Sequence, residues 1–341
     1  MRFPYIRRFG AGLAALALAV GVAACSSGSS SGGTSTSGTS GTSGSPEMTN
    51  VKVGILSASD DAPVLLAIKQ GFFRQQGLNV SYTIMPSTNA STALLQSHTI
   101  QFAIMNYVGM FQQEKAFPGL NLRIIADNVQ TSPGLFDFMV AKDSKIKTLA
   151  DLKGKKLSVP SAGVFSFPQL SLDVLGKPYG VNAGSVTDIA IPFPSAPQAL
   201  ASGKVDAAFT TEPFITIMEQ TTGARVLVDM LSGPLAGFPV SAWGTTQYYT
   251  QHDPKTVAAF ARAIQEATRY AAANPQAVRQ VLPTFIKGMK PALASVIVLP
   301  TFNTSLSLTR MQRVASSMES FGQLSASFVK TEVPAMYDPQ T

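Results

Sequence analysis

The chain has 341 residues, of which 45% are hydrophobic and 13% are charged, so it can bury a large core and disorder of the whole chain is excluded. It has one cysteine, Cys25, and two widely separated histidines, which excludes an intramolecular disulfide, a cysteine-cluster metal site and a histidine-rich metal site. The formal net charge of +7 falls to +4 without Arg2, Arg7 and Arg8, and Lys and Arg form no cluster with aromatic residues, so we expect no nucleic-acid partner.

The first 24 residues have the pattern of a secretory signal. Three arginines precede an uncharged run of Ala, Leu, Val and Gly over residues 10–24. The run ends in VAAC at residues 22–25, which resembles the lipobox of bacterial lipoproteins. This resemblance implies cleavage before Cys25 and attachment of lipid to its thiol, and therefore an extracytoplasmic protein anchored to the cell membrane. An ordinary signal with an incidental cysteine is the alternative.

A linker follows the signal, and we assign residues 25–46 to the lipidated Cys25 and this linker. Residues 26–45 are only Ser, Gly and Thr, so they have nothing to bury and are expected to be a flexible coil. Twenty such residues span about 25 Å on average. That length suits a tether that holds a folded body close to a membrane.

From residue 51 onward, short apolar strands alternate with amphipathic helices, and this alternation predicts an α/β fold with mainly parallel sheets. The length also favours two lobes or domains, at about 150 residues each. The expected strands are 51–56, 80–85, 102–105, 122–126, 138–141, 157–159, 186–191, 207–210, 225–228 and 239–245. The expected helices are 64–70, 90–96, 107–116, 166–175, 196–201, 213–222, 256–274, 276–282, 292–298 and 308–321.

Four segments in one order resemble a known family. They are QGFFRQQGLNV (70–80), LQSHTIQFA (95–103), TLADLKGKKL (148–157) and ALASGKVDAAFTTEP (199–213). Together they are similar to motifs of the substrate-binding proteins of ABC importers of the nitrate, sulfonate and taurine type, including the branch for thiamine pyrimidine precursors. The second segment departs from the family pattern, because His98 and Gln101 stand where members usually have Gly and Asp.

The resemblance implies a two-lobed fold of the periplasmic-binding-protein type II class. We expect the first lobe to comprise residues 47–141 and 244–341 and the second residues 142–243. The chain would cross between them near 138–141 and 239–245. The helical C-terminal region would pack on the first lobe, because it is too short for an α/β domain of its own.

Ligands of open α/β sheets bind beyond the carboxyl ends of strands, where helix N-termini offer free N–H groups. The residues that follow the expected strands therefore form the predicted ligand site, with Trp243 added as a ring that could stack on a flat ligand. They are Ser59, Asp60, Asp61, Asn106, Tyr107, Ser161, Ala162, Gly163, Phe165, Thr210, Thr211, Glu212 and Trp243. No catalytic residue, metal or cofactor is expected.

Three of these residues have a structural alternative. Asp61 is as well suited to cap the helix that follows it. Glu212 precedes Pro213 and is equally suited to a helix N-terminus. Trp243 is as consistent with the core as with the cleft.

Acidic residues dominate the predicted site. Asp60, Asp61 and Glu212 belong to it, whereas no Lys or Arg does. Three carboxylates oppose an anion, so the sequence favours a zwitterionic, cationic or N-heterocyclic solute, such as a taurine-like amine or a thiamine-pyrimidine-like ring.

The function that the resemblance implies is capture of a small solute by a monomeric lipoprotein and its delivery to an ABC permease and its ATPase. A solute-sensing surface receptor would have the same fold and remains an alternative. A pyrimidine-precursor synthase, an enzyme of one branch of the superfamily, is a further alternative that the export signal disfavours.

Overall fold

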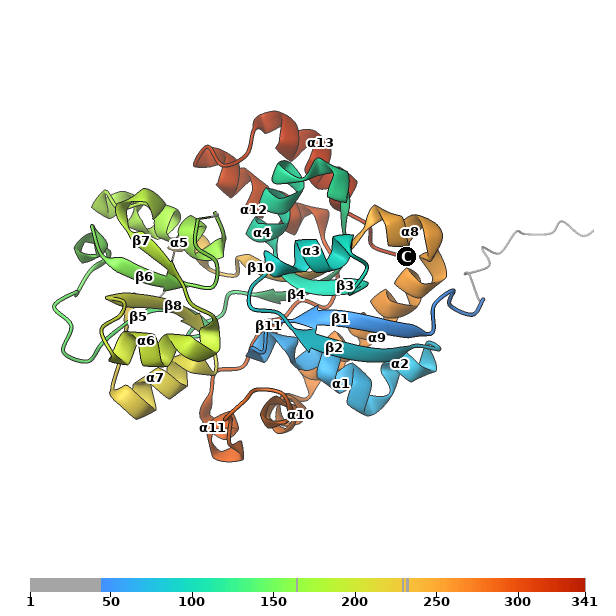
Figure 1. The fold of residues 1–341 in the computed structure, drawn as a ribbon, viewed down its shortest axis with the longest axis horizontal. Coiled ribbons are helices and arrows are strands. Elements are labelled where there is room, and N and C mark those ends of the chain that lie inside the picture. The colour runs from blue at the N-terminus through green and yellow to red at the C-terminus, as the bar shows by residue number, and fades with distance from the viewer. Residues whose placement is uncertain (1–43, 164, 229, 231–232, 341) are drawn as a thin grey trace, which may run out of the picture. The chain divides into compact units, whose positions relative to one another are not determined.

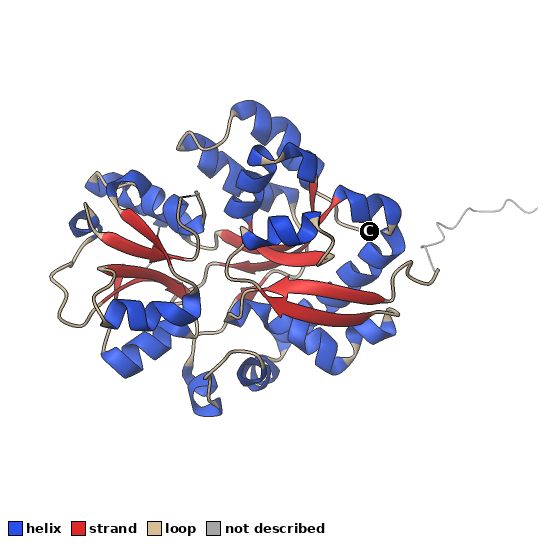
Figure 2. Ribbon diagram, in the orientation of Figure 1, coloured by secondary structure: helices blue, strands red, loops and turns tan. Residues whose placement is uncertain are grey.

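The computed structural model describes residues 44–163, 165–228, 230 and 233–340. The predicted signal, the lipidation of Cys25 and most of the linker lie outside these residues. Two β-sheets form the centres of two lobes, and helices flank each sheet (Figure 1; Figure 2). The predicted α/β two-lobed fold is confirmed. No helix within the described ranges is both long and apolar enough to span a bilayer.

The first lobe contains a six-stranded mixed sheet in the order β11-β4-β10-β3-β1-β2. Its strands are β1 (Asn50–Ile55), β2 (Asn79–Ile84), β3 (Phe102–Asn106), β4 (Leu122–Gln130), β10 (Pro239–Thr246) and β11 (Thr301–Phe302). Strand β1 is parallel to β2 and β3, whereas β10 is antiparallel to β3 and β4. The carboxyl ends of β1, β2 and β3 therefore share one edge.

The helices of the first lobe include most of the C-terminal third of the chain. They are α1 (Ala62–Gln70), α2 (Phe72–Gln75), α3 (Ala90–Gln96), α4 (Tyr107–Ala116), α8 (Gln247–His252), α9 (Pro254–Ala273), α10 (Pro275–Val281), α11 (Pro291–Val296), α12 (Leu308–Ser320) and α13 (Ala326–Met336). Helix α9 packs on α1, α2 and β4, α12 on α4, and α13 on β4. The C-terminal region thus covers the first lobe as expected, and α11 also contacts α7 of the second lobe.

The second lobe contains a five-stranded mixed sheet in the order β7-β6-β8-β5-β9. Its strands are β5 (Phe136–Val140), β6 (Lys156–Val159), β7 (Thr187–Ala190), β8 (Ala207–Thr211) and β9 (Arg225–Val228). Its α-helices are α5 (Phe167–Gly176), α6 (Ala196–Ala201) and α7 (Phe214–Thr222). Short 3-10 helices over both lobes are η1 (Ser59–Asp61), η2 (Pro118–Leu120), η3 (Leu149–Leu152), η4 (Lys177–Tyr179), η5 (Ala183–Ser185), η6 (Phe193–Ser195), η7 (Gly233–Leu235) and η8 (Leu282–Thr284).

The lobe boundaries differ from those expected. Strand β5 pairs with β8 and β9, and the whole of β10 lies in the first sheet, so the chain crosses before each of these strands. Both strands run antiparallel to their neighbours, which makes the sheets mixed. The two crossings are joined, because the Thr131 amide donates to the Phe238 carbonyl at 2.8 Å and the Phe238 amide donates to Thr131 Oγ1 at 2.8 Å.

An aromatic stack fills the core beneath the first sheet. Phe260 of α9 stacks on Phe102 with ring centroids 4.0 Å apart, and on Phe73 at 5.3 Å. Trp243 of β10 meets the edge of the same Phe260 ring at 5.5 Å and is fully buried. Phe73, from the QGFFRQQGLNV segment, therefore attaches α2 to α9.

His98 occupies a turn whose backbone conformation favours glycine, the residue that the family resemblance implies at this position. Its φ of 55° lies in the left-handed region, which glycine adopts without steric cost. Here the turn is held by side chains: Gln101 Nε2 donates to the His98 carbonyl at 3.1 Å, and His98 Nδ1 lies 2.9 Å from the Tyr249 hydroxyl. The departure from the family pattern is thus accommodated locally.

Candidate ligand-binding cleft

A cavity of about 320 Å³ lies between the two lobes and is lined by residues of both. Its volume suits a small organic molecule. Loops at the carboxyl ends of β1, β2, β3, β6 and β7 contribute to its wall, together with residues of β5, β8 and β10. The cavity therefore lies where an α/β sheet is expected to bind its ligand.

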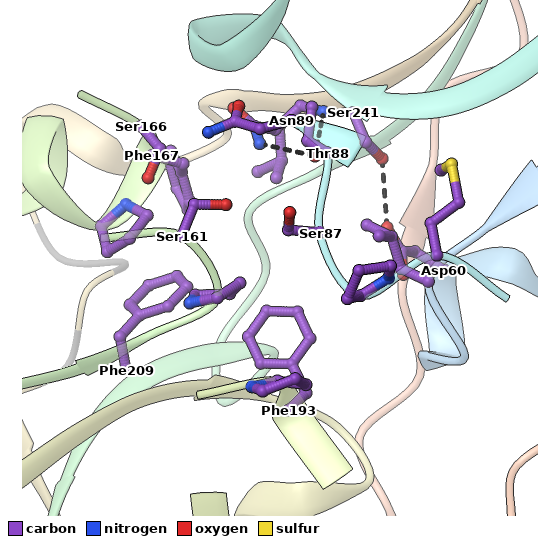
Figure 3. A pocket seen from close by; sticks show the side chains of 18 of the residues that line it. Asp60, Ser87, Thr88, Asn89, Ser161, Ser166, Phe167, Phe193, Phe209 and Ser241 are labelled. Carbon is purple, nitrogen blue, oxygen red and sulfur yellow. Dashed lines mark hydrogen bonds between the residues drawn. The ribbon is translucent and has the colours of Figure 1, made fainter. Parts of the chain in front are cut away.

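The two lobes contribute different chemistry to the wall. The first lobe supplies most of the polar side chains, which are Asp60, Ser87, Thr88, Asn89, Asn106 and Ser241. The second lobe supplies a mostly apolar surface, formed by Phe136, Pro160, Phe167, Pro168, Pro192, Phe193, Pro194 and Phe209. In Figure 3, Asp60 and Ser241 lie on one side of the cavity, and Phe193 and Phe209 lie on the other. A ligand that fits this wall has a polar edge and an apolar body.

Asp60 reaches the cavity because its neighbour Asp61 builds the turn after β1. The Asp61 carboxylate accepts hydrogen bonds from the backbone N–H groups of Ala58 at 2.9 Å and Leu56 at 3.1 Å. Helix α1 then begins at Ala62 with Pro63 in its first turn. The Asp61 carboxylate thus stabilises the turn, whereas the Asp60 carboxylate lies on the cavity wall.

Asp60 is the only ionisable side chain among the described residues that line the cavity. Its side chain is buried, and burial raises its pKa to about 6, although the hydrogen bond from Ser241 opposes that shift. Burial and the adjacent Asp60 charge also raise the pKa of Asp61. The described wall of the cavity therefore contains one carboxylate and no cationic side chain to balance it.

We expect Asp60 to make the ligand-free protein less stable as pH rises. The pKa of Asp60 is about 6 in the folded chain against an ordinary 3.8, so the folded state holds the proton more tightly. Its contribution is present at acidic pH and is lost as pH rises through about 6, with a size of roughly 3 kcal/mol at most. Urea unfolding of the wild type and Asp60→Asn from pH 4 to 8 measures it as the difference between the two curves. A difference that does not change with pH contradicts this prediction.

Three of the predicted site residues line the cavity, namely Asp60, Asn106 and Ser161. Asn106 has a second role, because its Oδ1 accepts a hydrogen bond from the Gly109 amide at 2.6 Å and so caps α4. Its Nδ2 donates to Thr88 Oγ1 at 2.9 Å, which ties the loop after β2 to the end of β3. Ala162, Gly163 and Phe165 follow Ser161 in the chain but are not part of the wall.

The other predicted residues are buried and are absent from the cavity wall. The Tyr107 hydroxyl donates to Asp127 at 2.9 Å, and the Thr211 hydroxyl donates to the Leu135 carbonyl at 2.8 Å. Ser59 and Thr210 are fully buried, as are Asp61 in its turn and Trp243 in the core.

Glu212 also has a structural role. Its carboxylate accepts from the Thr216 hydroxyl at 2.7 Å and from the Val298 amide at 3.2 Å. Its backbone carbonyl accepts from the Ser59 amide at 3.1 Å. Because Ser59 and Val298 belong to the first lobe, Glu212 holds the two lobes together beside the cavity.

Several wall residues were not predicted. Ser87, Thr88 and Asn89 follow the carboxyl end of β2, so the rule that selected the other loops also applied to them. Phe136 and Phe209 lie within β5 and β8, where no sequence signal separates a wall position from a core position. Ser241 lies within β10 and carried no signal either.

Comparison with known proteins places the chain in a family. The NMT1/THI5-like family profile matches residues 58–278. The chain belongs to the NMT1/THI5-like family. Among the described residues, this NMT1/THI5-like chain has no group of three or more His, Cys, Asp or Glu side chains that could hold a metal ion.

The curated relatives of this NMT1/THI5-like protein include a protein named as a binding protein and a protein named as an enzyme. A Brucella abortus (strain 2308) protein with a provisional binding-protein name is 27% identical over 256 residues, covering 74% of this chain and 76% of that protein. The 4-amino-5-hydroxymethyl-2-methylpyrimidine phosphate synthase THI13 of Saccharomyces cerevisiae is 25% identical over 228 residues, covering 62% and 64%.

Solved structures share the fold. The alkanesulfonate-binding protein SsuA of Xanthomonas axonopodis pv. citri, bound to MOPS, superposes with a TM-score of 0.69 at 18% identity, covering 86% of this chain and 99% of that chain. The periplasmic nitrate-binding protein NrtA of Synechocystis PCC 6803 gives a TM-score of 0.70 at 16% identity, covering 86% and 87%. The fold is therefore that of periplasmic solute-binding proteins.

Proposed function

We propose that this protein is the extracytoplasmic solute-binding component of an ABC importer, which captures a small organic solute between its lobes and delivers it to a permease. Three observations support this: membership of the NMT1/THI5-like family, the fold shared with solute-binding proteins, and the cavity between the lobes. The signal and lipobox pattern before Cys25 supports a membrane-anchored location outside the cytoplasm.

The observation that carries the ligand class is that Asp60 is the one charged side chain among the described residues of the cavity wall, many of which are phenylalanine or proline. A buried carboxylate needs a cation or N–H donors to balance its desolvation. The phenylalanine and proline rings of the second lobe suit a flat or apolar body. We therefore propose an aromatic amine or N-heterocycle, such as an aminopyrimidine, whose N–H groups donate to Asp60.

A simple anion fits this cavity less well. An alkanesulfonate would be buried beside Asp60 with hydroxyl and amide donors alone to stabilise it, because the described wall residues include no Lys or Arg. The alkanesulfonate-binding neighbour is 18% identical to this chain, so the likeness concerns the fold and not the ligand.

We expect a ligand screen to separate these classes. Isothermal titration and thermal shift of the purified protein should detect 4-amino-5-hydroxymethyl-2-methylpyrimidine or related amines, and not ethanesulfonate or nitrate. A solute at a hundred times its dissociation constant should raise the unfolding free energy by about 2.7 kcal/mol. Saturable binding of ethanesulfonate, without binding of any amine or heterocycle, would falsify the proposed ligand class.

Two further measurements test the synthase and sensor alternatives. A synthase would release a chemically changed product, whereas we expect mass spectrometry of the bound solute to show it unchanged. The described cavity wall contains no His or Lys side chain, which supports binding over that chemistry. A sensor would bind the solute without supporting uptake, so solute uptake by cells with and without the gene separates transport from sensing.

A further inference from the structure

Asp60 is held by two residues that are not its neighbours in the chain. Ser241 Oγ lies 3.2 Å from Asp60 Oδ2, a contact drawn in Figure 3. Asn128, fully buried on β4, donates through Nδ2 to the Asp60 backbone carbonyl at 2.9 Å and to Ser241 Oγ at 3.2 Å. One amide thus holds both the loop that carries Asp60 and the hydroxyl that contacts its carboxylate.

The geometry determines the direction of these hydrogen bonds. The Asp60 carbonyl can only accept, so the side of the Asn128 amide that faces it must be the NH₂ group. The same NH₂ group donates to Ser241 Oγ, and the hydroxyl therefore directs its single proton to the Asp60 carboxylate. Asp60 is accordingly held as a hydrogen-bond acceptor.

Strand β10 is irregular at the position that makes this contact. Its register against β4 shifts on both sides of Ser241, between Pro239 and Ser241 and between Ser241 and Ala242. Bulges of this kind redirect a side chain and often lie beside functional sites. The register shifts of β10 thus occur at the residue whose hydroxyl points toward Asp60.

We propose that Asn128 and Ser241 are positioning residues that hold the Asp60 carboxylate as an acceptor and thereby make the cavity select ligands that present N–H donors. This inference rests on the proposed function, because it specifies how the same cavity discriminates between solutes. A carboxylate has about four acceptor sites, so the bond from Ser241 leaves others for a ligand.

Other charged groups surround this arrangement and are common to all variants below. Asp61 precedes α1 on the same loop as Asp60. Asp127 adjoins Asn128 on β4 and forms an ion pair with Arg310 of α12 at 2.7 Å. From the second lobe, Glu212 approaches through its backbone carbonyl, which accepts from Ser59.

The first test measures Asp60 without any ligand. Carboxyl ¹³C NMR of the protein, assigned with Asp60→Asn, follows its titration directly. Ser241→Ala removes a hydrogen bond to the charged form, so the midpoint of Asp60 should rise by roughly one pH unit. The matched control is Thr245→Val, which removes another buried β10 hydroxyl, bonded to the Gln101 carbonyl at 2.8 Å, and should leave the midpoint unchanged.

A double-mutant cycle tests whether Asn128 acts through Ser241. Asn128→Ala should shift the Asp60 midpoint in the same direction by a smaller amount, and should add little in the Ser241→Ala background. Equal and additive shifts, or no shift in Ser241→Ala, overturn the positioning role. If Asn128→Ala does not fold, Ser241→Ala against Thr245→Val still decides the matter.

The second test measures selectivity with two probes, benzamidine and ethanesulfonate. Near pH 6, Ser241→Ala should lose several-fold in benzamidine affinity, because less of its Asp60 is ionised there, and raising the pH should restore the affinity as Asp60 ionises again. A loss that persists at high pH indicates a purely structural effect and overturns the proposal. If the wild type binds neither benzamidine nor any aminopyrimidine, the proposed ligand class fails, and the NMR midpoints still decide the role of Ser241.

Discussion

Asp60→Asn is expected to lower affinity for a protonated amine such as benzamidine by about thirtyfold or more. Losing one partner of a buried charge pair costs roughly 2–5 kcal/mol of binding free energy. Asp60 is the only ionisable side chain on the described cavity wall, so no other carboxylate there can replace it. Isothermal titration near neutral pH measures the change.

The same variant should not be less stable than the wild type at neutral pH. Burial raises the pKa of Asp60 to about 6, so its carboxylate is ionised there at a cost to folding, which asparagine avoids. Urea unfolding provides this control. Unchanged benzamidine affinity in a folded Asp60→Asn protein would remove Asp60 from the binding site.

Trp243→Ala is expected to destabilise the protein by about 3–5 kcal/mol, the usual cost of deleting a large buried aromatic side chain. Trp243 is fully buried against Phe260 and is absent from the cavity wall. Ligand affinity of the molecules that remain folded should therefore stay close to that of the wild type. Urea unfolding and isothermal titration measure the two quantities.

Phe193→Ala is the matched control for that prediction. Phe193 lies on the cavity wall, is only partly buried and belongs to the apolar surface of the second lobe. Its loss should weaken ligand binding more than it destabilises the fold. If Trp243→Ala instead reduced affinity while leaving stability intact, Trp243 would have to be returned to the ligand site.

The sequence predicted the class of fold well, because alternating apolar strands and amphipathic helices are a local signal. The lobe boundaries, in contrast, depend on contacts between distant segments and have no local signal in the sequence. Strand β5 is buried along its whole length and carries no mark of the sheet to which it belongs. Only its pairing with β8 and β9 assigns it to the second lobe.

The cavity wall was predictable to the extent that it follows strand ends. Of the residues selected by that rule, Asp60, Asn106 and Ser161 line the cavity, and the rule would also have selected Ser87 had it been applied after β2. It could not decide between neighbours such as Asp60 and Asp61, because the turn determines which carboxylate caps backbone amides. Trp243 was added separately as a ring that could stack on a ligand. The sequence could not place this residue, because every position of β10 is buried and periodicity cannot tell which face meets α9.

The unequal chemistry of the two lobes has a consequence for the empty protein. When the halves separate, the second lobe presents rings of Phe136, Phe193 and Phe209 to water, whereas the first presents groups that water hydrates well. The free-energy cost of opening therefore comes mainly from the second lobe, and the ligand-free protein should favour a nearly closed conformation. A solute would then bind to the polar first lobe before the apolar second lobe covers it, and its release would require water to hydrate the aromatic rings of the second lobe.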